Sequence, residues 1–249
     1  MTAIPSEPHL RDQLACFFWS GDTLRSRSVS DTVLSGAVEV PAPPARLSAD
    51  WEREIAQQLQ LEAGDVEPLS LPRARMRWPD YRHCVQAVAD WTRGLARGEL
   101  LAASDVALMA CRGAKYHHDG AQYGAMAFCN LFLSEDKGLD LHFPAAGRRI
   151  PLRRGTVVIF DTGQPHAVID RGSSSFDATR FGPGCDCSQI FLSWELPVED
   201  PHVAHALGIR FDVDPGSATH LDQPQLRLNG APAEVSAASG LWAAPVQIP

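Results

Sequence analysis

Hydrophobic positions recur at helical spacing in two stretches of the first hundred residues. In SADWEREIAQQLQL (48–61), apolar side chains return every third or fourth position behind Ser48, a residue type that often caps helices. In PDYRHCVQAVADWTRGLARG (79–98), a longer apolar stripe runs between an opening Pro-Asp and a closing glycine. The pattern predicts a helix over each stretch and an extended segment at 66–78.

From residue 105 to residue 197 the pattern changes to short segments rich in β-branched and aromatic residues. Gly, Pro, Asp or Ser separates them: DVALMACRGAKYHHD, YGAMAFCNLFLS, LDLHFPA, RRIPL, GTVVIFDTG, HAVIDRG and SQIFLSWEL. Many short strands divided by turn residues are typical of a β-sandwich or barrel. We therefore expect one mainly β domain with flanking helices. Residues 1–104 form a helical and extended support, 105–197 the core, and 198–249 an extension in which Asn229-Gly230 predicts a hairpin.

Composition and charge narrow the possible partners. The 249 residues are 45% hydrophobic and 21% charged, which is ordinary for a globular protein with one sizeable core. The apolar runs are too short to span a membrane, and the N-terminus does not resemble a secretory signal, so we expect a cytoplasmic protein with no membrane partner. A formal net charge of −8 argues against a nucleic-acid partner, including a nucleic-acid demethylase role.

The six cysteines show no CxxC spacing. In a cytoplasmic chain of this length they are expected to be reduced and mostly buried. Cys185 and Cys187, in GPGCDCS, are close in sequence and suggest a tight loop, with a metal or redox role as the alternative.

The segment KYHHDGAQYG (115–124) carries the first candidate chemistry. In a β-strand, residues i and i+2 share a face, about 6–7 Å apart at the backbone. His117 and Asp119 can therefore converge on one ion, while His118 should point to the opposite face as a packed or hydrogen-bonded histidine.

A third ligand candidate is His166, in GTVVIFDTGQPHAVIDRG. A strand, a polar loop in which Asp161 should stabilise the turn, and a second strand could bring His166 back beside 117–119. Two histidines and one carboxylate on one face of an octahedron are typical of non-haem Fe(II) oxygenases, because three coordination positions stay open. The reversed pair of Asp140 and His142 is a weaker competitor.

These segments resemble a known family. HHDG followed by PLRRGTVVIFDTGQPHAV is similar to the His-x-Asp, GxxVxFD and distal His pattern of the Fe(II)/2-oxoglutarate-dependent dioxygenase superfamily, over about residues 105–197. The first motif is also similar to that of a small bacterial branch that hydroxylates free amino acids. The resemblance implies a double-stranded β-helix (jelly-roll, cupin-like) core. It also implies Fe(II) held by His117, Asp119 and His166, 2-oxoglutarate as cosubstrate, dioxygen, and hydroxylation of a small molecule such as a free amino acid.

The family usually anchors the far carboxylate of 2-oxoglutarate with a basic residue on the last core strand, and SQIFLSWEL has none. Arg180 is our preferred anchor, because a guanidinium can bind a carboxylate through two hydrogen bonds. Arg171 should point away from the metal by strand alternation, whereas Arg112 or Arg75 could substitute from another element. Gln189 could help from the last strand.

Other polar residues lie on otherwise apolar elements. Asn130 is costly to bury without a hydrogen bond, so it should contact either the cosubstrate or the backbone. Gln122 and Tyr123 could face the mouth of a substrate pocket or lie on its rim. Two further classes stay open: a cupin-like metalloenzyme that does not use 2-oxoglutarate, and a jelly-roll binding protein without enzymatic activity.

Overall fold

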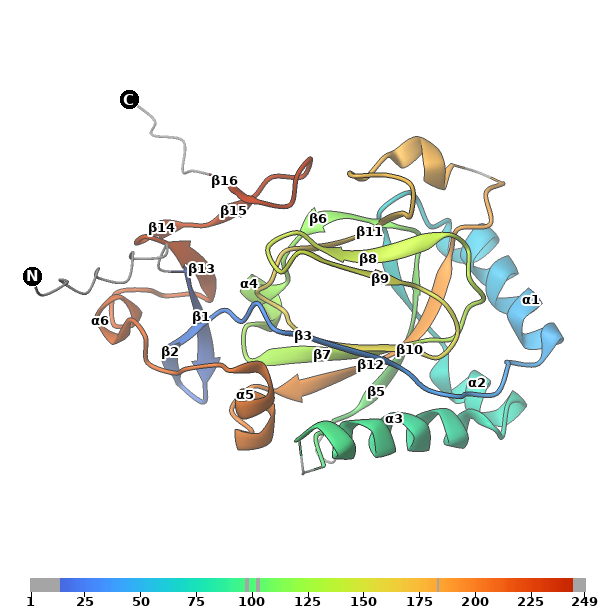
Figure 1. Ribbon diagram of the computed structural model, residues 1–249, viewed down its shortest axis with the longest axis horizontal. Helices are drawn as coiled ribbons and strands as arrows, with labels where there is room; N and C mark the ends of the chain where they lie inside the picture. Colours follow the sequence, from blue (N-terminus) through green and yellow to red (C-terminus); the bar gives the residue numbers. More distant parts are fainter. Residues whose placement is uncertain (1–13, 97–98, 102–103, 183, 244–249) are drawn as a thin grey trace, which may run out of the picture.

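Two antiparallel β-sheets face each other at the centre of the molecule (Figure 1). The structure is a computed structural model that describes residues 14–96, 99–101, 104–182 and 184–243. Across the larger sheet, the order is β3 (Val33–Ala37), β10 (Thr156–Asp161), β7 (Met126–Phe132), β12 (Gln189–Pro197), β5 (Val106–Cys111) and β4 (Val66–Leu69). Across the smaller sheet, it is β6 (Ala114–His117), β11 (His166–Asp170), β8 (Leu139–Phe143) and β9 (Arg148–Pro151). This is the jelly-roll core that the sequence predicts.

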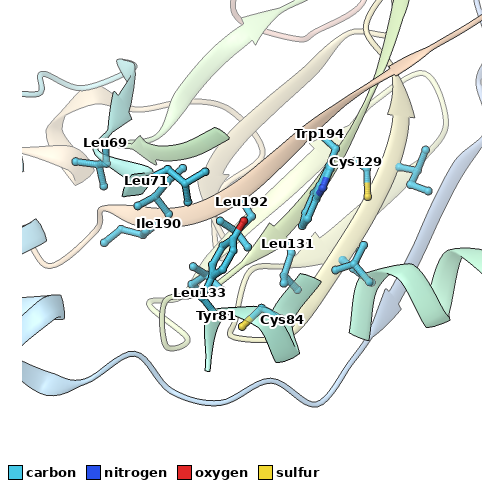
Figure 2. Close-up of a cluster of buried hydrophobic side chains, with 14 of the residues drawn as sticks. Leu69, Leu71, Tyr81, Cys84, Cys129, Leu131, Leu133, Ile190, Leu192 and Trp194 are labelled. Carbon is cyan, nitrogen blue, oxygen red and sulfur yellow. The ribbon is translucent and has the colours of Figure 1, made fainter. Parts of the chain in front are cut away.

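Helices cover the outer face of the larger sheet. They are α1 (Ala45–Glu54), which continues into the π-helical turn η1 (Ile55–Leu59), α2 (Leu71–Arg77) and α3 (Tyr81–Ala96). Alternate residues of the strands point toward them, and Figure 2 shows Leu192 and Trp194 of β12 beside Leu131 of β7. The other face of the same strands points toward the smaller sheet, where Phe160 and Phe143 pack edge to face with ring centroids 5.1 Å apart.

A third sheet lies at one end of the core, in the order β14 (Ala231–Pro232), β13 (Gln225–Leu228), β1 (Leu14–Ser20) and β2 (Thr23–Ser28). β1 and β13 contact the short helix α4 (Gly120–Tyr123), which directly follows the first histidine motif. The remaining elements are the 3₁₀ turn η2 (Ala178–Phe181), α5 (Pro201–Leu207), α6 (Pro215–Ala218), β15 (Glu234–Val235) and β16 (Trp242–Ala243). The third sheet therefore supports the histidine end of the core.

The two predicted helices are present. The first begins at Ala45, so Ser48 lies inside the helix and Pro44 occupies the N-cap position. The predicted extended segment at 66–78 is correct for β4 but wrong for 71–77, which forms α2, because Pro72 fits the first turn of a helix where its missing N–H is not needed.

Strands β1 to β3 come from the N-terminal region in which the sequence showed mainly helical signals, and β3 and β4 join the core sheet. The Asn229-Gly230 hairpin is confirmed: Leu228 pairs with Ala231, and the two turn residues have φ values of 52° and 80°. All six cysteines are free thiols, as predicted, with Cys185 exposed. Among the described residues, no helix combines the length and the apolar character needed to cross a membrane.

Candidate metal centre

The three predicted ligands lie together at the ends of two neighbouring strands. His117 is the last residue of β6 and His166 the first of β11, and the antiparallel register places them directly opposite each other. Their ring centroids are 4.4 Å apart. Asp119 completes the group, with its Oδ1 3.6 Å from Nε2 of His117 and its Oδ2 3.5 Å from Nε2 of His166. Among the described residues, this is the one group of three His, Cys, Asp or Glu side chains close enough to share a metal ion.

Asp119 reaches the site through a turn, which corrects the expectation of an unbroken strand. β6 ends at His117, and Asp119 has φ −104° and ψ 2°, with its backbone N–H donating to the carbonyl of Thr162 at 2.8 Å. His118 lies outside the triad, as predicted, with its ring 5.5 Å from that of Trp242.

The glycine after Asp119 permits this turn. A Cβ on Gly120 would lie 2.5 Å from Cδ1 of Leu226 and 2.9 Å from Cα of Gly163. Because the backbone of Gly163 cannot swing away as a flexible side chain would, position 120 accepts no larger residue without moving the loop before His166.

Hydrogen bonds fix the orientation of both imidazoles. Nδ1 of His117 lies 2.6 Å from the carbonyl of Lys115, and Nδ1 of His166 lies 3.0 Å from the carbonyl of Gln164. Each Nδ1–H therefore donates to a carbonyl, which leaves the Nε2 lone pair directed at Asp119.

Burial shifts the pKa of two members of the triad, His166 and Asp119. It lowers the pKa of His166 to about 3, so this imidazole is neutral at pH 7 and can act as a ligand. Burial also raises the pKa of the Asp119 carboxyl, and a bound cation would reverse that effect. Nitrogen-to-oxygen separations of 3.5–3.6 Å are close to the ~3 Å expected between adjacent ligands with metal bonds of about 2.1 Å, so the donor set fits a divalent metal.

A buried ion pair stabilises the loop that leads to His166. Asp161 accepts two hydrogen bonds from the guanidinium of Arg27, at 2.7 and 2.8 Å, and both side chains are fully buried. The same carboxylate accepts the backbone N–H groups of Gly163 and Ser30, both at 2.8 Å. The predicted role of Asp161 in the turn is confirmed. Its partner Arg27, on β2, was not predicted from the sequence.

A cavity of about 780 Å³ extends from the triad between the two sheets, large enough for a small molecule. Phe160 closes it against His166, with ring centroids 4.8 Å apart, and Phe128 packs on Phe160 at 5.9 Å. Gln122 and Tyr123 both line the cavity, with Gln122 exposed and Tyr123 half-buried.

The three residues predicted to contact the cosubstrate lie in different surroundings. Asn130 lines the cavity, is 8% exposed, and its Oδ1 has no hydrogen-bond partner among the described residues. Gln189 is fully buried outside the cavity lining, and neither its Oε1 nor its Nε2 has a described partner. Arg180 lies on the surface, 61% exposed and paired with Asp170 at 2.8 Å, so the structure does not bring it to the triad.

The alternative arginines are also engaged elsewhere. Arg112 donates to the carbonyl of Phe181 at 2.7 Å, and the guanidinium of Arg75 lies over the ring of Tyr81 at 5.3 Å. Arg171 forms ion pairs with two aspartates, at 2.8 Å each, in keeping with its expected outward direction. Among the described residues, neither an arginine nor a lysine lines the cavity.

The competing pair on β8 is not a metal site. Asp140 accepts from Arg171 at 2.8 Å and from Arg149 at 3.2 Å. Nδ1 of His142 lies 2.5 Å from the hydroxyl of Tyr116. Both side chains therefore have partners within the smaller sheet.

Comparisons with known proteins give weak structural matches. No protein-family model matches the chain, and no curated protein matches it. The chain is similar to EvdO2 from Micromonospora carbonacea var. aurantiaca (12% identity, 76% of this chain and 92% of that chain, TM-score 0.40). It is also similar to AviO1 from Streptomyces viridochromogenes Tue57, with 14% identity over 69% of this chain and 91% of that chain and a TM-score of 0.38. A third match is the viral collagen prolyl hydroxylase of Paramecium Bursaria Chlorella virus-1, solved as a 2OG complex. It has 11% identity over 66% of this chain and 94% of that chain and a TM-score of 0.37. Similarity at this level does not establish a shared activity.

Proposed function

We propose that the protein is a mononuclear non-haem Fe(II) oxygenase that uses 2-oxoglutarate and dioxygen to hydroxylate a small molecule. The observation that carries the proposal is the convergence of two imidazoles and one carboxylate on the wall of a cavity of about 780 Å³. A triad on one face of an octahedral ion leaves positions open for other ligands, which is the arrangement such oxygenases need. The sequence pattern around His117, Asp119 and His166 supports the same class.

In this proposal each part of the site has a defined task. His117, Asp119 and His166 would hold Fe(II), which supplies the redox chemistry when bound. The carbonyls of Lys115 and Gln164 keep the two Nε2 atoms directed at the ion. The aromatic rings next to His166 exclude water from the reacting end of the cavity.

The lining and the volume of the cavity support the proposed cosubstrate and the proposed size of the substrate. Asn130 is the predicted cosubstrate contact that lines it, and its amide is available for a hydrogen bond. The volume suits a metabolite of amino-acid size. With a net charge of −8, the proposal includes no nucleic-acid partner, and it places the protein in the cytoplasm without a membrane partner.

The decisive experiment measures iron content and succinate formation in the full chain, supplied with Fe(II), ascorbate, 2-oxoglutarate and a panel of small molecules. His166→Ala should lose both Fe(II) and 2-oxoglutarate turnover. His118→Ala is the matched control, because it removes a neighbouring imidazole that faces Trp242, and it should keep both. Unchanged iron content in His166→Ala would rule out the ligand assignment and favour a binding protein without a catalytic metal.

A second candidate is a cupin-like metalloenzyme that does not use 2-oxoglutarate. It is favoured by the absence of arginine and lysine from the described cavity lining, since the far carboxylate of 2-oxoglutarate normally pairs with a cation. Metal-dependent oxygen consumption that does not change when 2-oxoglutarate is added would select this candidate.

A further inference from the structure

A row of aromatic side chains in mutual contact lines one wall of the cavity. The ring of Tyr123 packs on that of Phe128 with centroids 5.1 Å apart, and Phe128 packs on Phe160 at 5.9 Å. Phe160 in turn contacts the ligand His166, with centroids 4.8 Å apart. All four side chains line the cavity. Ring contacts therefore connect Tyr123 to the candidate metal centre.

One half of this row is open to the cavity. Phe160 is 1% exposed and His166 is 7% exposed, so protein atoms cover both rings almost completely. Tyr123 and Phe128 are only half-buried, and so is Met126, which lies between them in sequence and lines the same cavity. Apolar surface that stays in contact with water is costly, and a ligand that covers it gains this free energy. The open half is therefore suited to bind the apolar part of a ligand.

Hydrogen bonds of the backbone hold this open surface in place beside the triad. The N–H of Tyr123 donates to the carbonyl of Asp119 at 2.7 Å, which places the phenol one helical turn after the ligand. Oγ1 of the buried Thr162 lies 2.8 Å from the carbonyls of both Tyr123 and Met126. Phe128 lies on β7, which is paired on both sides, with β10 and β12. Because the surface is preformed, little ordering is needed when a ligand binds.

The hydroxyl of Tyr123 adds one polar group to this surface. It forms no hydrogen bond with any described residue. Burial raises the pKa of this phenol, and the negative charges of Glu195 and Asp119 add to the rise, so the hydroxyl is protonated at pH 7 and can donate. A ligand can therefore bind the ring by packing and the hydroxyl by a hydrogen bond, which fixes its orientation.

The angles between the rings indicate which apolar group fits best. Tyr123 and Phe128 are inclined at 63°, and Phe128 and Phe160 at 79°, so each pair packs edge to face. Edge-to-face packing sets the positive edge of one ring against the negative face of the next, and a ligand ring can extend this arrangement. A saturated group of equal size gains only the burial of its area. The surface therefore favours an aromatic ligand over an aliphatic one.

We propose that the substrate of the oxygenase carries an aromatic ring, which packs against Tyr123 and Phe128, and a hydrogen-bonding group that reaches the Tyr123 hydroxyl. The identification of this aromatic ligand as the substrate rests on the proposed function, whereas its binding to the surface does not. The inference narrows the substrate class, because aliphatic free amino acids do not meet this requirement.

The test compares two probes with the same carbon skeleton, 3-phenylpropan-1-ol and 3-cyclohexylpropan-1-ol, by isothermal titration calorimetry on the full chain with redox-inert Zn(II). The phenyl probe should bind about threefold more tightly, although the cyclohexyl probe is the more hydrophobic of the two. Phe128→Leu and Tyr123→Leu should each abolish this preference, because each removes one ring of the surface. Tyr123→Phe should weaken the binding of both probes by about threefold and keep the preference, because it removes only the hydroxyl.

Phe191→Leu is the matched control. Phe191 lines the same cavity, but it packs on Phe132 with ring centroids 5.3 Å apart and is 8% exposed, so it offers a ligand little open surface. This variant should keep the preference for the phenyl probe. Thermal unfolding establishes that each variant is folded, and the two leucine variants at 123 and 128 test the surface at independent positions.

Other outcomes overturn the inference. Equal or tighter binding of the cyclohexyl probe would show that the surface does not favour aromatic rings. An equal loss of preference in Phe191→Leu and Phe128→Leu would show that the ring does not bind at the open surface. If the phenyl preference depends on Phe128 but no compound supports 2-oxoglutarate turnover, only the proposed function fails. Turnover of aliphatic compounds without any phenyl preference would refute only the aromatic surface.

Discussion

The two faces of strand β12 differ in how tightly their side chains pack and in how polar those side chains are. On the outer face, Leu192 and Trp194 are buried against the helices and their neighbouring strands. On the inner face, Ser193 and Glu195 line the cavity. Residues one position apart therefore have different roles, because successive side chains of a strand point to opposite faces of the sheet. The outer face provides the stability of the fold, and the inner face keeps polar groups that stability alone would not select.

The first prediction concerns Asp161, a fully buried carboxylate at the end of β10 in the same sheet, which is paired with Arg27. Arg27→Met should lower the free energy of unfolding by about 3–5 kcal/mol, because it leaves a fully buried carboxylate without its cation. Urea denaturation measures the loss. Zn(II) affinity below the unfolding transition should also fall, since Asp161 holds the loop before His166.

Arg180→Met is the control for this prediction. It removes a guanidinium from an exposed pair with Asp170, and the free energy of unfolding should not change measurably. Equal effects of the two substitutions would show that the buried pair does not stabilise the metal end.

The second prediction compares neighbouring residues on the two faces. Leu192→Ala should lower the free energy of unfolding by about 2–5 kcal/mol, since it leaves a cavity in a packed region where Leu192 is 0% exposed. Ser193→Ala should change it by about 0.5 kcal/mol or less, because Ser193 lines an existing cavity. Both values come from denaturant unfolding. A Ser193→Ala loss as large as that of Leu192→Ala would mean that the inner face also carries the stability.

The third prediction is a gain in the free energy of unfolding rather than a loss. Gln189→Leu should raise the free energy of unfolding by about 1 kcal/mol, because the buried amide lacks hydrogen-bond partners and an apolar side chain removes that penalty. Chemical unfolding measures the gain, and Zn(II) affinity serves as the control. A loss of stability would show that the buried amide is satisfied in the folded chain, for example by water, and that its polar atoms stabilise the fold.

The core and the triad could be predicted from the sequence because their signals are local. Short apolar segments between turn residues indicate strands, and His117 and Asp119 are close in sequence while His166 follows a recognisable strand and loop. The details depend on contacts distant in sequence. Asp119 was expected on a strand, but a hydrogen bond to Thr162 turns the chain after His117.

The missed features all require a partner that the local sequence does not reveal. Arg27 lies in TLRSRS, a stretch that reads as a solvated surface, and its partner Asp161 is 134 positions away. The 71–77 helix was missed because its proline and its three arginines interrupt the apolar pattern, although Pro72 marks a helix start.

The prediction with the smallest expected effect compares the alkylation rates of two thiols, one on each face of the larger sheet. Cys129 is fully buried on the outer face, and Cys111 lines the cavity at 3% exposure. Burial raises the pKa of Cys111 to about 12 and also raises that of Cys129. Both should therefore react with iodoacetamide far more slowly than the exposed Cys185, and the Cys111 rate should rise about tenfold per pH unit below its pKa, as the thiolate fraction does.

The two thiols should nevertheless respond differently to loss of the outer core. Alkylation of Cys129 requires unfolding, so Leu192→Ala, at about 3 kcal/mol, should accelerate it roughly hundredfold when refolding is faster than labelling. Cys111 can react through the cavity, so its rate should change far less. Peptide mass spectrometry of timed samples measures both rates in one experiment, with Cys185 as the internal standard. If both rates rise by the same factor, the two faces open together, and the division of stability and chemistry between them is wrong.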